Sequence, residues 1–105
     1  MKFSLIICGY NEADNLDTCI KSCLELNYNK KEYEIIYVDN NSKDNSIKVA
    51  KKYPIKVISE RKQGLSEARN KGIKSAKGDI LVFLDADIKL TEDYLINLEK
   101  GFNKT

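Results

Sequence analysis

The sequence predicts an α/β fold, a Rossmann-like three-layer sandwich built around a parallel sheet. Short apolar runs alternate with longer segments whose apolar residues recur at helical spacing. The last of these runs, residues 80–84, is continuously apolar, which is typical of a strand buried on both faces of a parallel sheet. Polar clusters follow three of the predicted strands, where ligands of such sheets bind.

The first strand–helix unit covers the amino-terminal quarter of the chain. Residues 3–8 form a short apolar run that leads into a polar segment without a small-residue cleavage site, so we expect a strand and no signal peptide. From Leu16 onward, apolar side chains recur at i, i+3, i+4, i+7 and i+8. This spacing predicts a helix over residues 15–26 with one buried face, and Asp14 is placed to cap it.

The second unit is shorter. Residues 28–34 are polar and are expected to form a loop before a second strand at residues 35–38. Residues 40–45 are rich in Asn, Ser and Asp, which favour turns and helix caps. A short helix should follow, with Asp44 as its expected cap, and should end before Pro54.

The second half of the chain repeats the pattern. Residues 55–58 are the third predicted strand and residues 80–84 the fourth. A helical stripe that ends before Gly78 lies between them and consists of Leu65, Ala68, Gly72, Ile73 and Ala76. Thr91 is expected to cap a last helix, whose apolar residues are Leu95, Leu98 and Phe102. Right-handed crossovers favour the strand order 3-2-1-4.

Composition excludes several classes of function. The 105 residues suffice for one domain, residues 1–105. A net charge of +2, from 18 basic and 16 acidic side chains, gives no general attraction to nucleic acid or to an anionic membrane. The apolar runs are far shorter than the ~20 residues that span a bilayer. We therefore expect a cytoplasmic domain without a transmembrane segment, free or at the cytoplasmic face of the membrane.

The three cysteines do not indicate a metal site. Cys8, Cys19 and Cys23 lack disulfide spacing, and the chain has no histidine. Cys19 and Cys23 lie on the apolar stripe of the first helix. Zinc would require four nitrogen or sulfur ligands, so buried thiols that act as small hydrophobic groups explain this pair better.

Polar residues after three strands should converge on one edge of the sheet. They are Gly9-Tyr10-Asn11-Glu12, Asp39-Asn40-Asn41 and Asp85-Ala86-Asp87. The last segment provides two carboxylates, which suit a divalent cation that bridges to a phosphate. A strand-end turn with Asp as a local cap is the alternative. Because two carboxylates are present, we favour metal or phosphate chemistry.

Four segments carry a family resemblance, in order along the chain: residues 3–12, 38–44, 64–72 and 82–87. Together they resemble the nucleotide-sugar-binding half of a family 2 glycosyltransferase with the GT-A fold, and they span nearly the whole chain. The resemblance implies a metal-dependent transfer of a sugar from a nucleotide-diphosphate donor, with UDP favoured and with inversion. It implies Mn²⁺ or Mg²⁺ as the cofactor and leaves the acceptor unidentified.

The resemblance also implies roles for the nucleobase contacts. Tyr10 would stack on the base, with Asn11 and Glu12 in the same motif, and a tyrosine packed on the first helix is the alternative. Asp39 would accept the uracil N–H, with Asn41 close by. An Asx-turn that opens the next helix is the alternative for Asp39.

Four further residues are assigned to the sugar nucleotide. Arg69, one of two arginines, would lie near the nucleotide, and the alternative is a solvated charge on a helix face. Gly64 would let the preceding loop turn tightly. Asp85 would contact the ribose or the metal, and Asp87 would bind the Mn²⁺ or Mg²⁺ that bridges the diphosphate.

The chain departs from the family pattern in two ways. Pro is usual at the position of Cys8 or Gly9, and its absence should loosen the nucleobase pocket. Only residues 88–105 follow Asp87, whereas family members continue much farther, with acceptor loops and a catalytic base. We therefore expect a donor-binding half that is truncated before the acceptor-binding part, that has little activity alone, and that self-associates or requires the missing half.

Other functional classes fit less well. A haloacid-dehalogenase-like phosphatase would need a Lys and further acidic residues after the Asp-x-Asp segment. A dinucleotide-binding domain would need Gly-x-Gly-x-x-Gly after the first strand, where Gly9 stands alone. A receiver domain would place its acidic residues after strands 1 and 3. The main alternative is a non-catalytic nucleotide-binding or interaction module on the same half-fold.

Overall fold

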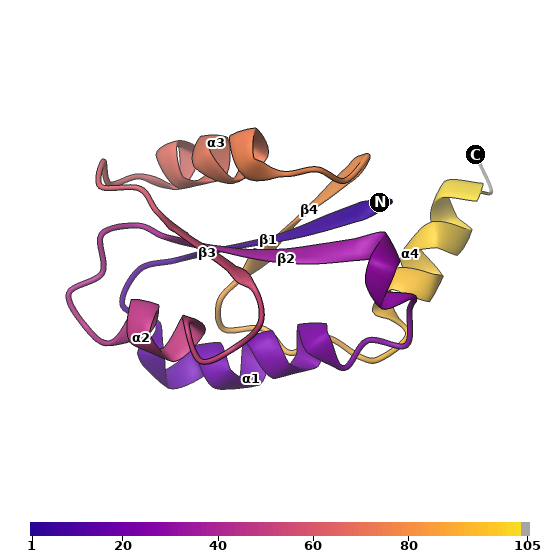
Figure 1. The fold of residues 1–105 in the computed structure, drawn as a ribbon, viewed down its shortest axis with the longest axis horizontal. Coiled ribbons are helices and arrows are strands. Elements are labelled where there is room, and N and C mark those ends of the chain that lie inside the picture. Colours follow the sequence, from indigo (N-terminus) through magenta and orange to yellow (C-terminus); the bar gives the residue numbers. More distant parts are fainter. Residues whose placement is uncertain (104–105) are drawn as a thin grey trace.

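The computed structural model describes residues 1–103, which form a four-stranded sheet between two layers of helices (Figure 1). The strands are β1 (Phe3–Gly9), β2 (Tyr33–Asp39), β3 (Lys56–Ser59) and β4 (Ile80–Asp85). All neighbouring strands run parallel, in the order β3-β2-β1-β4. The predicted fold class and strand order are confirmed.

The helices cover both faces of the sheet. α1 (Ala13–Leu24) and α2 (Ser46–Ala50) lie on one face, and α3 (Leu65–Ser75) lies on the other (Figure 1). α4 (Tyr94–Asn103) lies beside the end of the sheet at which β1 begins. Within residues 1–103, no helix has the length and apolar character needed to cross a membrane.

The core has two sides because successive strand residues point to opposite faces of the sheet. Phe3, Leu5 and Ile7 of β1 pack in the larger cluster, with α1. Ile6 packs in the smaller cluster, beneath Ala68 of α3. The sheet is therefore buried on both faces where β1 and β2 lie.

β4 differs from the expected strand that is buried on both faces. Val82 and Leu84 are buried in the core, but Phe83 is 36% exposed. Because β4 is an edge strand in residues 1–103 and α3 packs on β1 and β2, the Phe83 face remains partly open. Leu65 and Ile73 of α3 were expected in a buried stripe, but they are 54% and 45% exposed.

The start of α1 is set by a tertiary cap. The helix begins at Ala13, so Asp14 lies inside its first turn and is not the predicted cap. The Ala13 amide instead donates to Asp44 Oδ2 at 3.1 Å, and the Glu12 amide donates to Ser46 Oγ at 2.9 Å. These partners follow β2, so no local pattern could have revealed them.

Two other boundaries differ from expectation. Residues 28–34 were predicted as a loop, but a 3₁₀ turn lies there and β2 already begins at Tyr33, which pairs with Phe3. The last helix starts at Tyr94, too late for Thr91 to be the predicted cap; the Tyr94 amide donates instead to the backbone carbonyl of Thr91.

Candidate functional site

The three polar segments meet at the carboxyl-terminal edge of the sheet, as predicted. In the strand registers Gly9 lies beside Asp39, and Cys8 lies beside Asp85. The loop after β2 and the loop before α3 lie at the same end of the molecule, at the left of Figure 1. Residues from three strands therefore border one site.

Asn11 ties the loop after β1 to the loop after β2. Its backbone has a φ of 54°, a conformation that Asn tolerates better than most residues. Its amide donates to Ser42 Oγ at 2.8 Å, and its Oδ1 accepts from the Lys43 amide at 2.8 Å. Asn41 has a φ of 64° in the facing loop. Both asparagines shape the edge of the site through their backbones, and Asn11 also does so through its side chain.

Asp39 is buried, with 1% of its surface exposed, and is held by three hydrogen bonds. Oδ1 accepts from the Tyr37 hydroxyl and from Ser42 Oγ, both at 2.7 Å, and Oδ2 accepts from the Ser42 amide at 2.9 Å. The carboxylate thus holds the loop after β2 at Ser42, three residues on, and does not form the Asx-turn that would open the next helix, which begins at Ser46. A carboxylate has about four lone-pair positions, so a further donor fits its acceptor capacity.

Tyr37 joins the ends of β1, β2 and β4, a role that the sequence pattern did not reveal. A Cβ built on Gly9 would lie 3.0 Å from the Tyr37 hydroxyl oxygen and 3.3 Å from Ala86 Cβ. A side chain at Gly9 would therefore be crowded, and Tyr37 or Ala86 would have to shift by a few tenths of an ångström. Burial raises the pKa of Tyr37, and the hydrogen bond to Asp39 and the charge of Asp39 raise it further.

Asn40 fixes the loop that leads into α3, another role that the pattern did not reveal. Its Nδ2 donates to the backbone carbonyls of Glu60 and Lys62 at 3.0 and 2.9 Å. Its Oδ1 accepts from the Gly64 amide at 2.9 Å. Gly64 has a φ of 139°, which confirms that the loop needs a glycine there.

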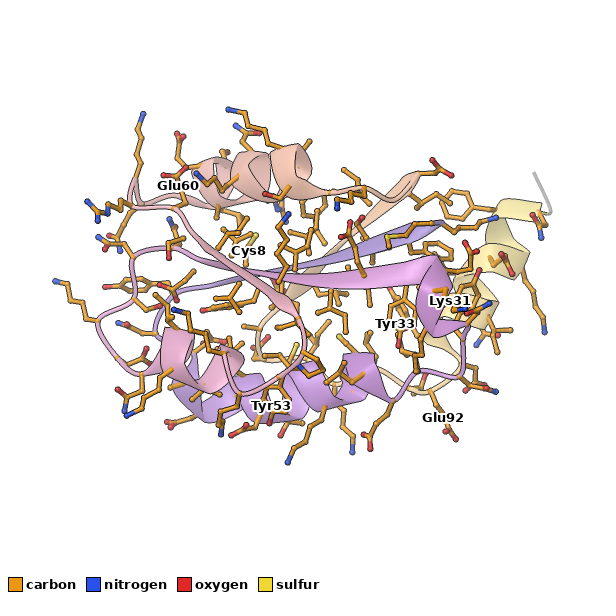
Figure 2. All side chains as sticks on the ribbon, viewed as in Figure 1. Cys8, Lys31, Tyr33, Tyr53, Glu60 and Glu92 are labelled. Carbon is orange, nitrogen blue, oxygen red and sulfur yellow. The ribbon has the colours of Figure 1, made fainter. Side chains whose placement is uncertain are left out.

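A small pocket opens at this edge, with a volume of about 200 Å³. Six residues line it: Cys8, Gly9, Tyr10, Asn40, Leu65 and Ala68. Tyr10 is 43% exposed and offers an aromatic surface for stacking. Cys8 lies between the sheet and α3 (Figure 2) and packs beside the smaller core cluster. The pocket thus has apolar walls and an exposed aromatic ring.

Arg69 extends from α3 toward the exposed face of β4. Its guanidinium lies 5.3 Å from the centre of the Phe83 ring, a cation–π contact. Burial raises the pKa of the Cys8 thiol, while the positive charge of Arg69 lowers it and the charge of Asp85 raises it. A cation and a carboxylate therefore both act on the pocket at Cys8.

Asp85 and Asp87 lie where β4 ends, and both are exposed. Between them Ala86 is buried, with 2% of its surface exposed. The Asp85 carbonyl accepts a hydrogen bond from the Ile88 amide at 3.3 Å, which closes a turn over residues 85–88. Both carboxylates are thus accessible to a ligand at the same edge as Tyr10.

The donor set suits a cation that is completed by phosphate. Within residues 1–103, no group of three or more His, Cys, Asp or Glu could hold a metal ion. Mg²⁺ in nucleotide sites is commonly bound by one or two carboxylates together with substrate phosphates and water. Asp85 and Asp87 meet that requirement without a preformed protein cage.

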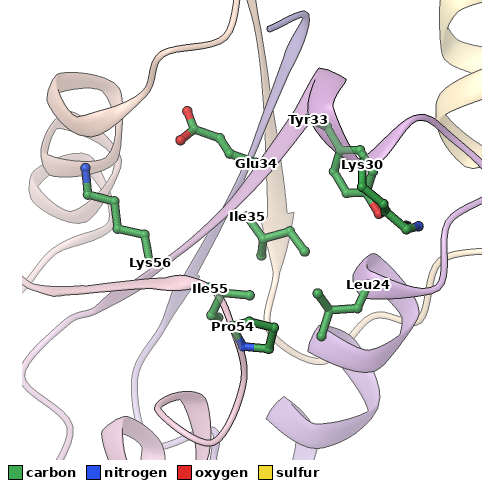
Figure 3. Close-up of a pocket in the computed structure, with 8 residues that line it drawn as sticks. All are labelled: Leu24, Lys30, Tyr33, Glu34, Ile35, Pro54, Ile55 and Lys56. Carbon is green, nitrogen blue, oxygen red and sulfur yellow. Dashed lines mark hydrogen bonds between the residues drawn. The ribbon is translucent and has the colours of Figure 1, made fainter.

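A larger hollow of about 590 Å³ lies near the start of β2 and β3, at the opposite end of the strands. Its walls include Leu24, Tyr33, Ile35 and Ile55 (Figure 3). The Tyr33 hydroxyl donates to the Cys23 carbonyl at 2.7 Å and accepts from Lys30 Nζ at 3.0 Å. These hydrogen bonds hold the start of β2 against α1. The polar strand-end residues lie at the opposite edge of the sheet.

Residues 4–105 match the family model described as Glycosyl transferase family 2. A cholesterol galactosyltransferase of Borreliella burgdorferi is 40% identical over 91 residues, which are 82% of this chain and 25% of that protein. A dolichol-phosphate mannosyltransferase of Pyrococcus furiosus is 42% identical over 94 residues, 85% of this chain and 26% of that protein.

Solved structures agree with the sequence comparison. Residues 1–349 of S. aureus TarS in complex with UDP-GlcNAc superpose with a TM-score of 0.91 at 26% identity, and the match covers 99% of this chain and 32% of that one. The mannosyltransferase PcManGT of Pyrobaculum calidifontis, in complex with GDP-Man and Mn²⁺, superposes with a TM-score of 0.88 at 27% identity. This match covers 94% of this chain and 31% of that one. This chain spans about a fifth to a third of the length of these proteins.

Proposed function

The chain belongs to glycosyl transferase family 2, and we propose that residues 1–105 are the donor-binding half of a metal-dependent glycosyltransferase. Its donor is a nucleotide-diphosphate sugar, with UDP as the nucleotide. The observation that carries this proposal is the convergence of Tyr10, Asp39 and the Asp85–Asp87 turn at one sheet edge, beside Arg69.

The nucleobase binds in the pocket beside Tyr10. The exposed ring of Tyr10 stacks on the base, a contact typically worth ~1–3 kcal/mol. Asp39 accepts the uracil N–H through the remaining capacity of its carboxylate, while Tyr37 and Ser42 hold that carboxylate in place. Asn11, Glu12 and Asn41 contribute mainly by shaping the two loops. The buried, hydrogen-bonded state of Asp39 supports a fixed acceptor.

The diphosphate lies between Arg69 and the two carboxylates that follow β4. Arg69 provides a planar set of donors that suits phosphate oxygens, and Gly64 sets the start of the helix that carries it. Asp85 and Asp87 hold Mn²⁺ or Mg²⁺. When bound, the cation neutralises the charge that develops on the departing nucleoside diphosphate. Neighbouring structures contain a nucleotide sugar or Mn²⁺ in their complexes, which supports this assignment.

The transfer itself requires more than these residues. No side chain among them matches the family's catalytic base, which deprotonates the acceptor hydroxyl and commonly contributes ~10²–10⁴-fold. We assign that base, the acceptor site and an inverting outcome to the remaining length that the relatives have. A cytoplasmic location is part of the same proposal, and the free thiols Cys8, Cys19 and Cys23 support a reducing compartment.

A non-catalytic nucleotide-binding or interaction module is the second candidate. It would use the same strand-end residues and the same pocket. It predicts the same pocket without sugar transfer.

Calorimetric titration of the chain with UDP, ADP and GDP, each with and without Mn²⁺, tests the proposal. Manganese-dependent and uridine-selective binding is the expected result. Hydrolysis or transfer of a UDP-sugar would favour the enzyme over the module. A folded chain that binds none of these nucleotides would refute the donor-site assignment for these residues.

A further inference from the structure

Two buried polar side chains of α1 hold the loop that follows β4. The Cys19 thiol donates to the backbone carbonyl of Asp85, with an Sγ–O distance of 3.7 Å. The Ser22 hydroxyl accepts from the Leu90 amide at 3.0 Å. Cys19 is fully buried and Ser22 nearly so. Because they are three positions apart, both lie on the same face of the helix.

The chain between these two anchors turns tightly and is packed down. The Asp85 carbonyl accepts one hydrogen bond from the Ile88 amide within the turn and a second from Cys19. Ala86 is buried in the same core cluster as Cys19. The exposed carboxylates of Asp85 and Asp87 therefore extend from a turn whose backbone is attached to α1.

We infer that Cys19 and Ser22 are positioning residues for the carboxylate pair Asp85 and Asp87. The inference rests on the proposed function, in which this pair binds the cation and the diphosphate. Two carboxylates that share one cation need a fixed separation, and a loop that is ordered before binding pays less entropy when the ligand arrives. Neither Cys19 nor Ser22 needs to touch the ligand.

Amide hydrogen exchange in the ligand-free 105-residue chain tests the anchoring directly. Cys19→Val removes the donor, and Cys19→Ser keeps one. Cys23→Val is the matched control, the same substitution at a second buried cysteine of α1. We expect exchange of the Ile88 amide to be at least about 5-fold faster in Cys19→Val than in Cys23→Val, and close to wild type in Cys19→Ser. Ser22→Ala should do the same to the Leu90 amide, while the β1 amides stay protected.

Metal titration tests the positioning. For each variant, the affinity for UDP is measured with and without Mn²⁺. The metal enhancement is the affinity with Mn²⁺ divided by the affinity without it. Cys19→Val and Ser22→Ala should lower this ratio by about 5-fold and leave metal-free binding unchanged, whereas Cys23→Val should keep it. A general structural defect would weaken UDP binding to the same extent with and without Mn²⁺.

The outcomes separate the two proposals. Wild-type rates at Ile88 in Cys19→Val and at Leu90 in Ser22→Ala would overturn the inference, and so would faster exchange with an unchanged metal enhancement. A wild-type chain that binds no UDP in Mn²⁺ would refute the proposed function and, with it, the role of this loop in metal binding. If Cys19→Val does not fold, Ser22→Ala still decides the matter, through exchange of the Leu90 amide and through the metal enhancement.

Discussion

The Tyr37 hydroxyl donates a 2.7 Å hydrogen bond to the carboxylate of Asp39, two residues farther along β2, and both side chains are buried. The bond joins the strand that ends at the proposed nucleobase pocket to the side chain proposed to recognise the base. The same hydroxyl fills the space that Gly9 leaves open at the end of β1. Tyr37 thus links packing at the strand ends to the position of a candidate ligand contact.

Stability should fall in alkaline solution because of Tyr37. Burial and the hydrogen bond to Asp39 raise the pKa of Tyr37 in the folded chain, whereas in the unfolded chain it lies near its ordinary value of about 10. The folded state then retains the proton that the unfolded state releases, so the stabilisation is complete below pH about 10 and is lost as the pH rises above it. Urea unfolding between pH 9 and 11 should show this loss.

Tyr37→Phe should remove part of that alkaline slope and should cost about 1–3 kcal/mol of unfolding free energy at neutral pH, since a hydrogen bond to a buried carboxylate is lost. Tyr10→Phe, at an exposed tyrosine, serves as the control and should keep the wild-type slope. Equal slopes in wild type and Tyr37→Phe would assign the alkaline loss to other groups.

Asp87→Asn should separate ligand binding from folding. Asp87 is exposed, so the change in unfolding free energy should stay within about 0.5 kcal/mol. Manganese-dependent affinity for UDP should fall at least about 10-fold, because an amide is a poorer ligand for a hard cation than a carboxylate. Asp79→Asn, at an exposed carboxylate just before β4, is the control and should bind UDP normally. A similar loss of stability and of binding would mark Asp87 as structural.

Arg69→Lys should weaken UDP binding about 10-fold and uridine binding much less. Lysine keeps the charge but loses the planar donor pair and the stacking on Phe83. Arg61→Lys, at the other arginine, should leave both affinities unchanged. Calorimetry with the two ligands distinguishes the cases, and an equal loss for uridine and UDP would argue against a diphosphate contact.

Gly72→Ala and Gly101→Ala should act in opposite directions, although both glycines lie in helices. A Cβ at Gly72 would lie 2.5 Å from Ile6 Cγ2, so α3 must move away from β1 at a cost of about 1–3 kcal/mol. A Cβ at Gly101 would meet nothing within 4 Å, and alanine there should stabilise α4 by up to ~1 kcal/mol. Thermal unfolding of both variants measures the difference, and a neutral Gly72→Ala would mean that α3 is loosely packed.

Self-association should occur through the β4 side of the sheet. β4 is an edge strand within residues 1–103, and its Phe83 is partly exposed. Light scattering after size exclusion should report a mass above that of the monomer at high concentration, and Phe83→Lys should reduce it. A monomeric mass at every concentration would contradict this prediction.

The sequence by itself determined the fold class, the strand order and the sheet edge at which the polar strand-end residues meet. Each followed from local or repeated patterns: apolar strands, helical spacing and polar residues at three strand ends. Residues 3–8 and 80–84 could be assigned to strands without knowledge of residues far away in the chain, because hydrophobic periodicity and composition are properties of neighbouring residues. The glycine requirement at Gly64 was visible for the same reason.

Only the tertiary structure showed which polar groups fix the loops and strand ends at the candidate site. The α1 cap by Asp44, the bond from Tyr37 to Asp39 and the anchor from Cys19 to Asp85 depend on how the strands and helices are brought together in space. The exposure of Phe83 likewise depends on which strands α3 covers. Sequence periodicity reports which face of an element is apolar, whereas the partner that meets that face is chosen only when the elements pack.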